Sequence, residues 1–212
     1  MRKLGMDELN RLSVNQFRQS EKTPIVVVLD NIRSMHNVGS VFRTADAFLV
    51  QGIYLCGFTP RPPHRDIHKT ALGATETVEW KYFTTTASAV VALREAGYTV
   101  FAVEQTEGSV ALQEVCSRWA GDFGEPGGDT GGESGGDCVE GAVGDLRPLA
   151  VVFGNEVEGV GAEALAVCDG AIEIPQWGMK HSLNISVAAG IVLWELVRER
   201  FAAAAAAMGL QK

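Results

Sequence analysis

The chain has 212 residues, enough for one full domain or for one domain and a short appendage. Its composition is 46% hydrophobic, 8% aromatic and 21% charged, which excludes wholesale disorder and collagen-like or coiled-coil architectures. No apolar run reaches the roughly 18 residues of a membrane-spanning helix, and the first 22 residues are too polar for a secretory signal, so we expect a soluble, cytoplasmic protein.

The formal net charge of −8 is concentrated in one segment. Residues 121–146 hold seven acidic side chains and no Lys or Arg, so the rest of the chain carries a formal charge of only −1. A local basic surface is therefore compatible with the overall charge. The same segment is rich in Gly and poor in apolar groups, and burial cannot offset the entropy of ordering it. We expect a flexible acidic insertion on the surface.

The four cysteines are widely scattered, at Cys56, Cys116, Cys138 and Cys168, and form no C-x-x-C pair. This spacing favours neither a zinc site nor a disulfide framework. We expect reduced thiols, as is usual in the cytoplasm, and no bound metal.

The predicted elements alternate between helices and strands. In chain order they are a helix at 7–19, a strand at 25–29, a helix at 37–48, a strand at 53–56, a long proline-containing loop, a strand at 78–83, a helix at 87–96, strands at 99–103 and 149–153, a short helix at 162–167, a strand at 171–174 and a closing helix at 184–208. The strands are continuous apolar runs, which indicates a mainly parallel sheet with helices on both faces, and hence an α/β fold. We expect a short helical extension at residues 1–22 and one domain at 23–212 that carries the acidic insertion.

Three polar segments directly follow predicted strands, where open α/β sheets bind their ligands. The first, DNIRSMHNVGSVFRTA, covers residues 30–45. Asn37 is placed to cap the helix that follows. The buried stripe of this helix is expected to hold Val38, Val41, Phe42, Ala45 and Phe48. Arg43 falls outside the stripe, and by itself it is typical of a solvated residue paired with Asp46.

The second segment, FGNEVEGVG, covers residues 153–161. Gly154, directly after a buried strand, lets a ligand approach the backbone closely and leaves Asn155 and Glu156 at the sheet edge. A glycine-rich turn with solvated carboxylates is the alternative interpretation. The spacing matches neither a Rossmann G-x-G-x-x-G motif nor a P-loop.

The third segment, IPQWGMKHSLNIS, covers residues 174–186. Pro175 ends a strand and Gly178 permits a sharp bend. Ser182 and Asn184 are both placed to cap the closing helix, a purely structural role that the sequence leaves open.

Together, the three segments resemble the signature motifs of the SpoU, or TrmH-like, family of RNA ribose methyltransferases in the SPOUT superfamily. The motifs are N-x-G-S-x-x-R-T-A, F-G-N-E-x-x-G and I-P-x-x-G-x-x-x-S-L-N-x-S-V-A-A, and residues 69–74 resemble a further family block. The matches run from about Thr23 to Leu196 and miss only the acidic insertion. The resemblance implies a C-terminal deep trefoil knot, a homodimer and S-adenosylmethionine as methyl donor, with S-adenosylhomocysteine as product.

The resemblance also assigns residues to roles. The expected catalytic residues are Arg43, Asn37, Glu156, Ser182 and Asn184. The expected cofactor contacts are Gly154, Asn155, Glu156, Ile174, Ser182 and Leu183. Arg43 is either the general base or a group that orients the 2′-hydroxyl and the neighbouring phosphate, with Glu156 holding the guanidinium of Arg43. We prefer the orienting role, because a guanidinium gives up a proton reluctantly.

The densest basic patch supplies the expected RNA contacts, Arg61, His64, Arg65 and Lys69. Transfer RNA is preferred over ribosomal RNA, because the chain is small and shows no separate recognition domain. Two alternatives remain open: a knotted RNA-binding or assembly factor without turnover, and a base-nitrogen methyltransferase. In the closing helix we expect one face to pack inward, and the resemblance places a dimer contact on this helix. The inward residues are Ile185, Ala188, Ala189, Val192 and Leu196.

Overall fold

The computed structural model of the protein describes residues 1–5, 8, 11–119 and 148–207. Within them, one sheet of seven strands has the order β3-β2-β1-β6-β4-β7-β5. The strands are β1 (Thr23–Asp30), β2 (Val50–Cys56), β3 (Trp80–Phe83), β4 (Thr99–Val103), β5 (Val110–Ala111), β6 (Leu149–Phe153) and β7 (Gly170–Glu173). Every pairing between them is parallel. The α/β class is therefore confirmed, and the trefoil knot stays a prediction.

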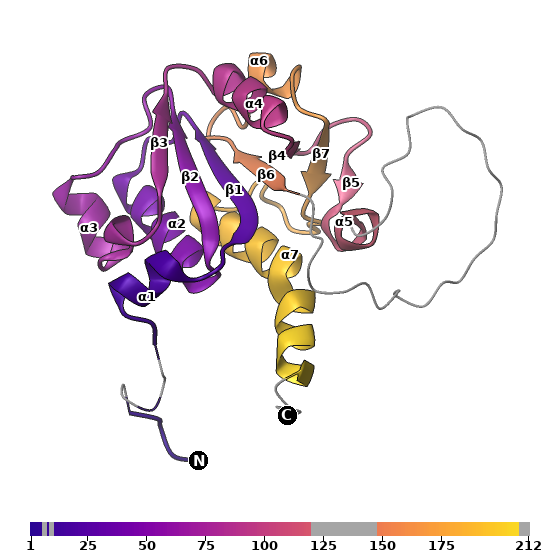
Figure 1. The fold of residues 1–212 in the computed structure, drawn as a ribbon. Helices are drawn as coiled ribbons and strands as arrows, with labels where there is room; N and C mark the ends of the chain where they lie inside the picture. The colour runs from indigo at the N-terminus through magenta and orange to yellow at the C-terminus, as the bar shows by residue number, and fades with distance from the viewer. Residues whose placement is uncertain (6–7, 9–10, 120–147, 208–212) are drawn as a thin grey trace, which may run out of the picture.

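Helices cover both faces of this sheet (Figure 1). They are α1 (Val14–Gln19), α2 (Met35–Ala47), α3 (Arg65–Ala71), the 3-10 helix η2 (Ala74–Glu76), α4 (Thr86–Glu95), α5 (Leu112–Trp119), α6 (Ala162–Leu165) and α7 (Ile185–Ala207). α4 and α6 cover one face, and α2 and α7 pack against the other. None of the helices in these ranges combines the length and hydropathy needed to cross a lipid bilayer.

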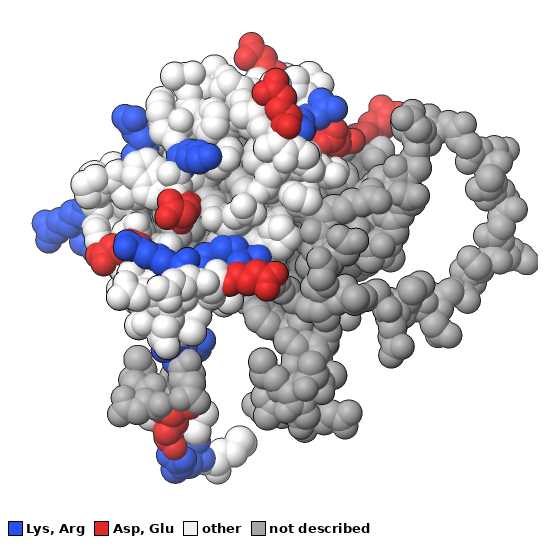
Figure 2. Space-filling model, viewed as in Figure 1, with Lys and Arg blue, Asp and Glu red and all other residues white. Residues whose placement is uncertain are grey.

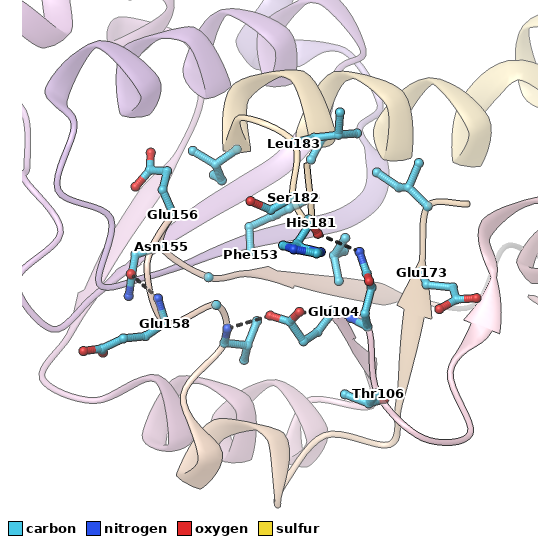
Figure 3. Close-up of a pocket in the computed structure, with 18 of the residues that line it drawn as sticks. Glu104, Thr106, Phe153, Asn155, Glu156, Glu158, Glu173, His181, Ser182 and Leu183 are labelled. Atoms are coloured by element: carbon cyan, nitrogen blue, oxygen red, sulfur yellow. Dashed lines mark hydrogen bonds between the residues drawn. The ribbon is translucent and has the colours of Figure 1, made fainter. Parts of the chain in front are cut away.

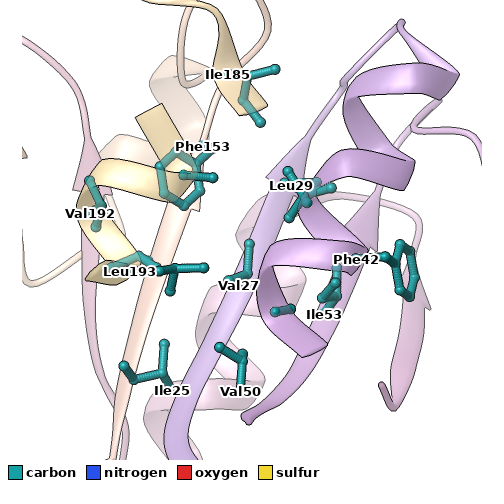
Figure 4. Close-up of a cluster of buried hydrophobic side chains, with 14 of the residues drawn as sticks. Ile25, Val27, Leu29, Phe42, Val50, Ile53, Phe153, Ile185, Val192 and Leu193 are labelled. Carbon is teal, nitrogen blue, oxygen red and sulfur yellow. The ribbon is translucent and has the colours of Figure 1, made fainter. Parts of the chain in front are cut away.

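The core consists of two layers, because side chains along a strand alternate between its faces. Ile25, Val27 and Leu29 of β1 belong to the layer under α2 and α7, whereas Val26 and Val28 belong to the layer under α4 and α6. Figure 4 shows the first layer, in which α2 and α7 flank β1. All five side chains are at most 3% exposed, and burial of each stabilises the fold by about 1.5–3 kcal/mol.

Several predicted boundaries were right and others were wrong. β4 and β6 match the predicted strands, since both are apolar runs at the centre of the sheet. α1 starts at Val14, where Ser13 and Gln16 form a capping box, whereas the predicted start at residue 7 lies outside the described residues. α3 was missed inside the predicted loop, since Pro62 and Pro63 precede the helix and do not interrupt it. β5 and α5 were also missed.

The remaining predicted boundaries agree to within a few residues. The predicted closing helix corresponds to α7, and the expected inward stripe is buried: Ile185, Ala188, Ala189, Val192 and Leu196. The acidic insertion at 121–146 and residue 208 lie outside the described residues.

The described cysteines are isolated thiols. Cys56 and Cys168 form no disulfide, as expected. Burial raises the pKa of the Cys56 thiol to about 12 and that of the Cys168 thiol to about 11, so both are protonated at neutral pH. The side chains of Cys116 and Cys138 lie outside the description. The described residues also contain no group of three or more His, Cys, Asp or Glu side chains arranged to bind a metal ion.

Candidate active site

A cavity of about 440 Å³ lies at the carboxyl ends of β4, β6 and β7 (Figure 3). Its walls come from the loops after these three strands and from the first turn of α7. The six predicted cofactor contacts all line it: Gly154, Asn155, Glu156, Ile174, Ser182 and Leu183. The structure thus brings together the second and third predicted segments, although α6 and β7 lie between them in the chain.

The loop after β6 folds back over its own first residue. The backbone N–H of Gly159 donates to the carbonyl of Asn155 (3.0 Å). The buried Asn155 side chain accepts hydrogen bonds from the N–H groups of Val157 (3.0 Å) and Glu158 (2.9 Å). A Cβ on Gly154 would lie 1.9 Å from the carbonyl carbon of Gly159, so any side chain there would force the loop open. Glycine at position 154 therefore lets the loop pack directly against the end of β6.

A residue that sequence analysis missed connects this loop to β4. Glu104 directly follows β4, and its carboxylate accepts hydrogen bonds from the backbone N–H groups of Val160 and Gln105, both at 3.0 Å. Gln105 in turn donates through Nε2 to the carbonyl oxygen of His181 (2.9 Å). The end of β4 therefore positions the second and third predicted segments. The available signal was the position of Glu104 and Gln105 immediately after a correctly predicted strand.

The cavity is acidic. Its lining includes the carboxylates of Glu104, Glu156, Glu158 and Glu173, and no Lys or Arg is present among the described residues that line it. Glu173 accepts a hydrogen bond from Ser109 (3.0 Å). Such a site favours a ligand with positive charge, since a low-dielectric wall strengthens the field of the carboxylates.

The three predicted segments meet at the mouth of this cavity. The Asn37 side chain donates to Oε1 of Glu156, and Asn184 donates through Nδ2 to Oδ1 of Asn37 (3.3 Å). Asn184 also caps α7, because its Oδ1 accepts the backbone N–H of Ser186 (2.9 Å). We refer to Asn37, Glu156 and Asn184 as the amide–carboxylate network.

Asn37 can join this network because it is not a helix cap. The predicted cap at Asn37 was wrong: α2 begins at Met35, and Ser34 accepts the backbone N–H of Asn37 (3.2 Å). A serine three residues upstream satisfies the helix terminus, which frees the Asn37 side chain for other partners. Ser182 lines the cavity without a side-chain hydrogen bond to any described residue.

Arg43 lies away from the network. It is the sixth residue after Asn37 on α2, which places the two about 120° apart around the helix and about 9 Å apart along it. Arg43 lines a second cavity, of about 550 Å³, that α1 and α2 form with η2. Neither expected partner forms an ion pair with it in the described structure: Glu156 accepts from Asn37, and Asp46 accepts from Thr77 (2.6 Å).

The fourth resembling block, at residues 69–74, packs against the first segment. A Cβ on Gly39 would lie 2.2 Å from Oγ1 of Thr70 and 2.3 Å from the carbonyl oxygen of Ile67. Thr70 also donates to the carbonyl of His36 (2.9 Å). Gly39 therefore allows α2 and α3 to approach closely.

The predicted RNA contacts lie near α3 and do not line the acidic cavity. His64 caps α3 by accepting the backbone N–H of Asp66 (3.1 Å). Lys69 forms an ion pair with Asp66 (2.6 Å), and this hydrogen bond lowers the pKa of the Asp66 carboxyl. Arg61 lies over the ring of Tyr82, 4.2 Å from its centroid. Arg65 is exposed and has no ion pair with a described residue. Arg61 and Arg65 are thus the cations of this patch that no described carboxylate neutralises.

Comparisons with known proteins agree with this geometry. The chain is 33% identical to a tRNA (guanosine(18)-2′-O)-methyltransferase of Thermus thermophilus over 92% of its own length and 86% of that protein. It is 31% identical to the 23S rRNA (guanosine-2′-O-)-methyltransferase RlmB of Vibrio parahaemolyticus, over 92% of its own length and 68% of that protein.

A solved structure of an rRNA methyltransferase from Sinorhizobium meliloti with bound AdoMet is similar in fold. It superimposes with a TM-score of 0.65 at 26% identity, covering 86% of this chain and 60% of that one. The model of the SpoU rRNA Methylase family matches residues 24–194, which include all three segments and both halves of the sheet. The chain belongs to the SpoU rRNA Methylase family.

Proposed function

We propose that this protein transfers the methyl group of S-adenosylmethionine to a ribose 2′-hydroxyl of RNA. The observation that carries the proposal is the amide–carboxylate network, which joins the three family segments at the mouth of an acidic cavity. The named relatives act on ribose 2′-hydroxyls of guanosines in tRNA or rRNA, and the similar rRNA methyltransferase from Sinorhizobium meliloti has been crystallised with AdoMet.

The cavity fits the methyl donor. Residues 154–160 of the loop after β6 line the cavity, and Ile174 and Leu183 supply apolar walls for a flat base. When bound, the donor supplies a methyl group on a positively charged sulfur, and the four carboxylates of the lining complement that charge. Glu104 acts indirectly, because it fastens the loop that carries Glu156.

The network is suited to hold a ribose. Glu156 accepts hydrogen bonds, and the amides of Asn37 and Asn184 both donate and accept them. A hydroxyl that enters the mouth of the cavity would be oriented by these groups and by Ser182. Correct alignment of reacting atoms lowers a barrier by up to about 7–11 kcal/mol, so orientation alone can supply a large part of the catalysis.

For Arg43, we propose the orienting role. Its side chain is exposed on another side of α2 from Asn37, beside the second cavity, where it can contact a phosphate of an RNA strand that extends beyond the bound ribose. A guanidinium binds phosphate in a bidentate manner and has a pKa above about 12, which makes it a poor base.

We propose tRNA as the substrate. The similarity to the tRNA enzyme spans most of both chains, 92% of this one and 86% of the other, whereas the rRNA enzyme has a larger unmatched part. The match along most of the tRNA enzyme supports this choice.

The test is a methylation assay with isotopically labelled donor, using bulk tRNA and bulk rRNA in parallel, followed by digestion to nucleosides and mass spectrometry. Label on a 2′-O-methyl nucleoside supports the proposal. Label on a base nitrogen identifies the alternative enzyme, and RNA binding without any label identifies a factor without turnover. Either result overturns the proposal.

The Arg43→Ala variant tests whether Arg43 takes part in methyl transfer. It is expected to abolish methyl transfer and to leave the affinity for S-adenosylmethionine, measured by calorimetry, largely unchanged. Arg43→Lys keeps a charge for the phosphate and should retain part of the activity. Turnover of Arg43→Ala at the wild-type rate would exclude both the orienting and the basic role.

We also propose that the protein forms a homodimer through α7. Val187, Ile191 and Trp194 recur at helical spacing on this helix and are 49%, 39% and 52% exposed. An exposed apolar row of this kind is typical of a contact surface. Light scattering should give the mass of two chains for the wild type and of one chain for Ile191→Asp.

A further inference from the structure

A second surface beyond the sheet combines exposed aromatic rings with arginines. Phe58 follows β2 and is 58% exposed, and the guanidinium of Arg33 lies 5.7 Å from its ring centroid. Tyr82 belongs to β3 and is 39% exposed, with the guanidinium of Arg61 at 4.2 Å. We refer to these four residues as the aromatic–arginine surface.

We propose that the aromatic–arginine surface binds an unpaired stretch of the RNA substrate by stacking bases on Phe58 and Tyr82. This inference deepens the proposed function, on which it rests, because it specifies a single-stranded or looped segment next to the methylated ribose. Aromatic rings stack on any base, and arginines contact the adjoining phosphates, so the combination suits unpaired nucleic acid.

The surface is held rigidly. The backbone N–H of Phe58 donates to Oδ1 of Asn31 (3.2 Å), and the hydroxyl of Tyr82 donates to the carbonyl of Gly57 (3.1 Å). Thr59 accepts the N–H of Ile32 and donates to the carbonyl of Leu29, both at 3.0 Å. A platform that is ordered before binding loses little conformational entropy when a base stacks on it.

Gly57 is required for this arrangement. Its φ of +62° is in the left-handed region, and a Cβ there would lie 2.0 Å from Oδ1 of Asn31. The close contact between the loops after β1 and β2 sets the position of Phe58 beside Arg33.

The surface is continuous with the active site. Arg33 directly precedes Ser34, the residue that caps α2, and Asn37 of the amide–carboxylate network is in the first turn of the same helix. A strand of RNA that places one ribose at Asn37 can therefore extend along residues 33–37 to Phe58 and then to Tyr82, through the contact between Tyr82 and Gly57.

The local charge favours a polyanion. Three segments around the ends of β1, β2 and β3 contain no Asp or Glu, although the chain has a net charge of −8. They are residues 31–45, 57–65 and 81–88. Their five cationic residues are Arg33, Arg43, Arg61, Arg65 and Lys81. On the face that Figure 2 shows, Lys and Arg side chains gather over the N-terminal half of the sheet, around α3 and β3. We therefore expect this surface to bind a partner that combines negative charge with exposed aromatic rings, as the phosphates and unpaired bases of single-stranded RNA do.

The experiment measures RNA affinity of the full chain by fluorescence anisotropy. The probes are a labelled oligoadenylate of about 12 nucleotides and an RNA duplex of similar length. Phe58→Leu keeps apolar bulk and removes the aromatic face, and we expect it to weaken oligoadenylate binding about 5- to 100-fold while duplex binding changes much less. Phe58→Trp should restore the affinity.

Val91→Ala is the matched control, because Val91 is an apolar residue of α4 with 43% exposure that belongs to neither the cavity nor this surface. It should bind both probes as the wild type does. Wild-type affinity of Phe58→Leu for oligoadenylate overturns the inference. An equal loss on both probes also overturns it, because the surface would then contact only phosphates or another partner.

Donor binding and thermal unfolding of each variant are measured in the same preparations. Phe58→Leu should keep the wild-type affinity for S-adenosylmethionine and the wild-type unfolding temperature, since the ring is exposed. If the wild type binds oligoadenylate by stacking but methylates no RNA, the proposed function fails and this inference stands. If the wild type methylates RNA and Phe58→Leu binds normally, only the inference fails.

Discussion

The carboxyl edge of the sheet divides into two regions of opposite charge. The cavity beyond β4, β6 and β7 is lined by four glutamates and, within the described part of the chain, by no Lys or Arg. Residues 31–45, 57–65 and 81–88, around the ends of β1, β2 and β3, hold five Lys and Arg and no Asp or Glu. One region suits a small cationic donor and the other a polyanion, and the amide–carboxylate network lies where the two meet.

The two regions also differ in what builds them. The cavity depends on main chain and on glycine, since Gly154 is covered by its own loop. The basic region depends on side chains, such as Arg61 on Tyr82. Substitutions in the first region should therefore act on donor affinity, and those in the second on RNA affinity, with little crossover. The following predictions test this separation, from the largest effect to the smallest.

Gly154→Ala should eliminate measurable donor binding. The added methyl would lie 1.9 Å from the Gly159 carbonyl carbon, which must move and open the loop over the cavity. Calorimetric titration with S-adenosylmethionine checks this, and RNA affinity should persist. Gly190→Ala is the control, because nothing lies within 4 Å of its added Cβ. Tight donor binding by Gly154→Ala would show that the loop does not form the cofactor wall.

Asn37→Ala should lower kcat by about 100-fold, the cost of a misplaced reacting group, with a small change in donor affinity. The variant removes the link between Glu156 and Asn184. Ser34→Ala is the matched control on the same helix terminus: loss of the cap should lower the unfolding free energy by about 1 kcal/mol and affect kcat far less. Equal kcat losses in the two variants would mean that Asn37 acts only through helix stability.

Arg65→Glu should weaken RNA binding. It should also make the plot of log affinity against log salt concentration less steep, by about the amount that one phosphate contact contributes. Lys69→Glu should have a smaller effect on the slope, because Asp66 already neutralises Lys69. Anisotropy titrations at several salt concentrations measure both. A larger effect from Lys69 would indicate that RNA displaces Asp66 from the ion pair.

Cys56 provides a test outside both regions. Its folded pKa is raised from 9.0 to about 12, so folding favours the thiol over the thiolate. The resulting stabilisation is present in full below about pH 9 and decreases as the pH rises toward 12, because the unfolded chain ionises first. Urea unfolding of the wild type and of Cys56→Ala between pH 8 and about 11 should show the wild type losing more stability. Parallel curves would contradict this.

Local patterns predicted a large part of the fold. β4 and β6 have the predicted bounds, because a continuous apolar run at the centre of a parallel sheet is determined by its own residues. The helices whose ends depend on capping were less accurate: the cap at Asn37 proved to be Ser34, and α1 begins after the capping box of Ser13, inside the predicted helix. Several polar residues near the start of a helix can each serve as its N-cap, so hydrophobic periodicity alone does not identify the residue that does.

The candidate site was predicted in composition but not in arrangement. The three segments were located from their positions after strands, and their cofactor candidates do line one cavity. Glu104 and Gln105 were overlooked: their position directly after β4 was the one signal, and they belong to none of the resembling motifs. The expected pair between Glu156 and Arg43 does not occur in the described structure, because the turn of α2 directs Asn37 and Arg43 to different sides.

The sequence by itself determined the α/β class, the central strands, the family and the candidate residues of the site, because these depend on residue types and short spacings. The tertiary structure alone decided which of those residues meet. Asn37 and Glu156 are 119 residues apart in the chain, and only the parallel order of β1 beside β6 brings their loops to one edge. Contacts over such separations depend on the packing of whole elements, which no local pattern encodes.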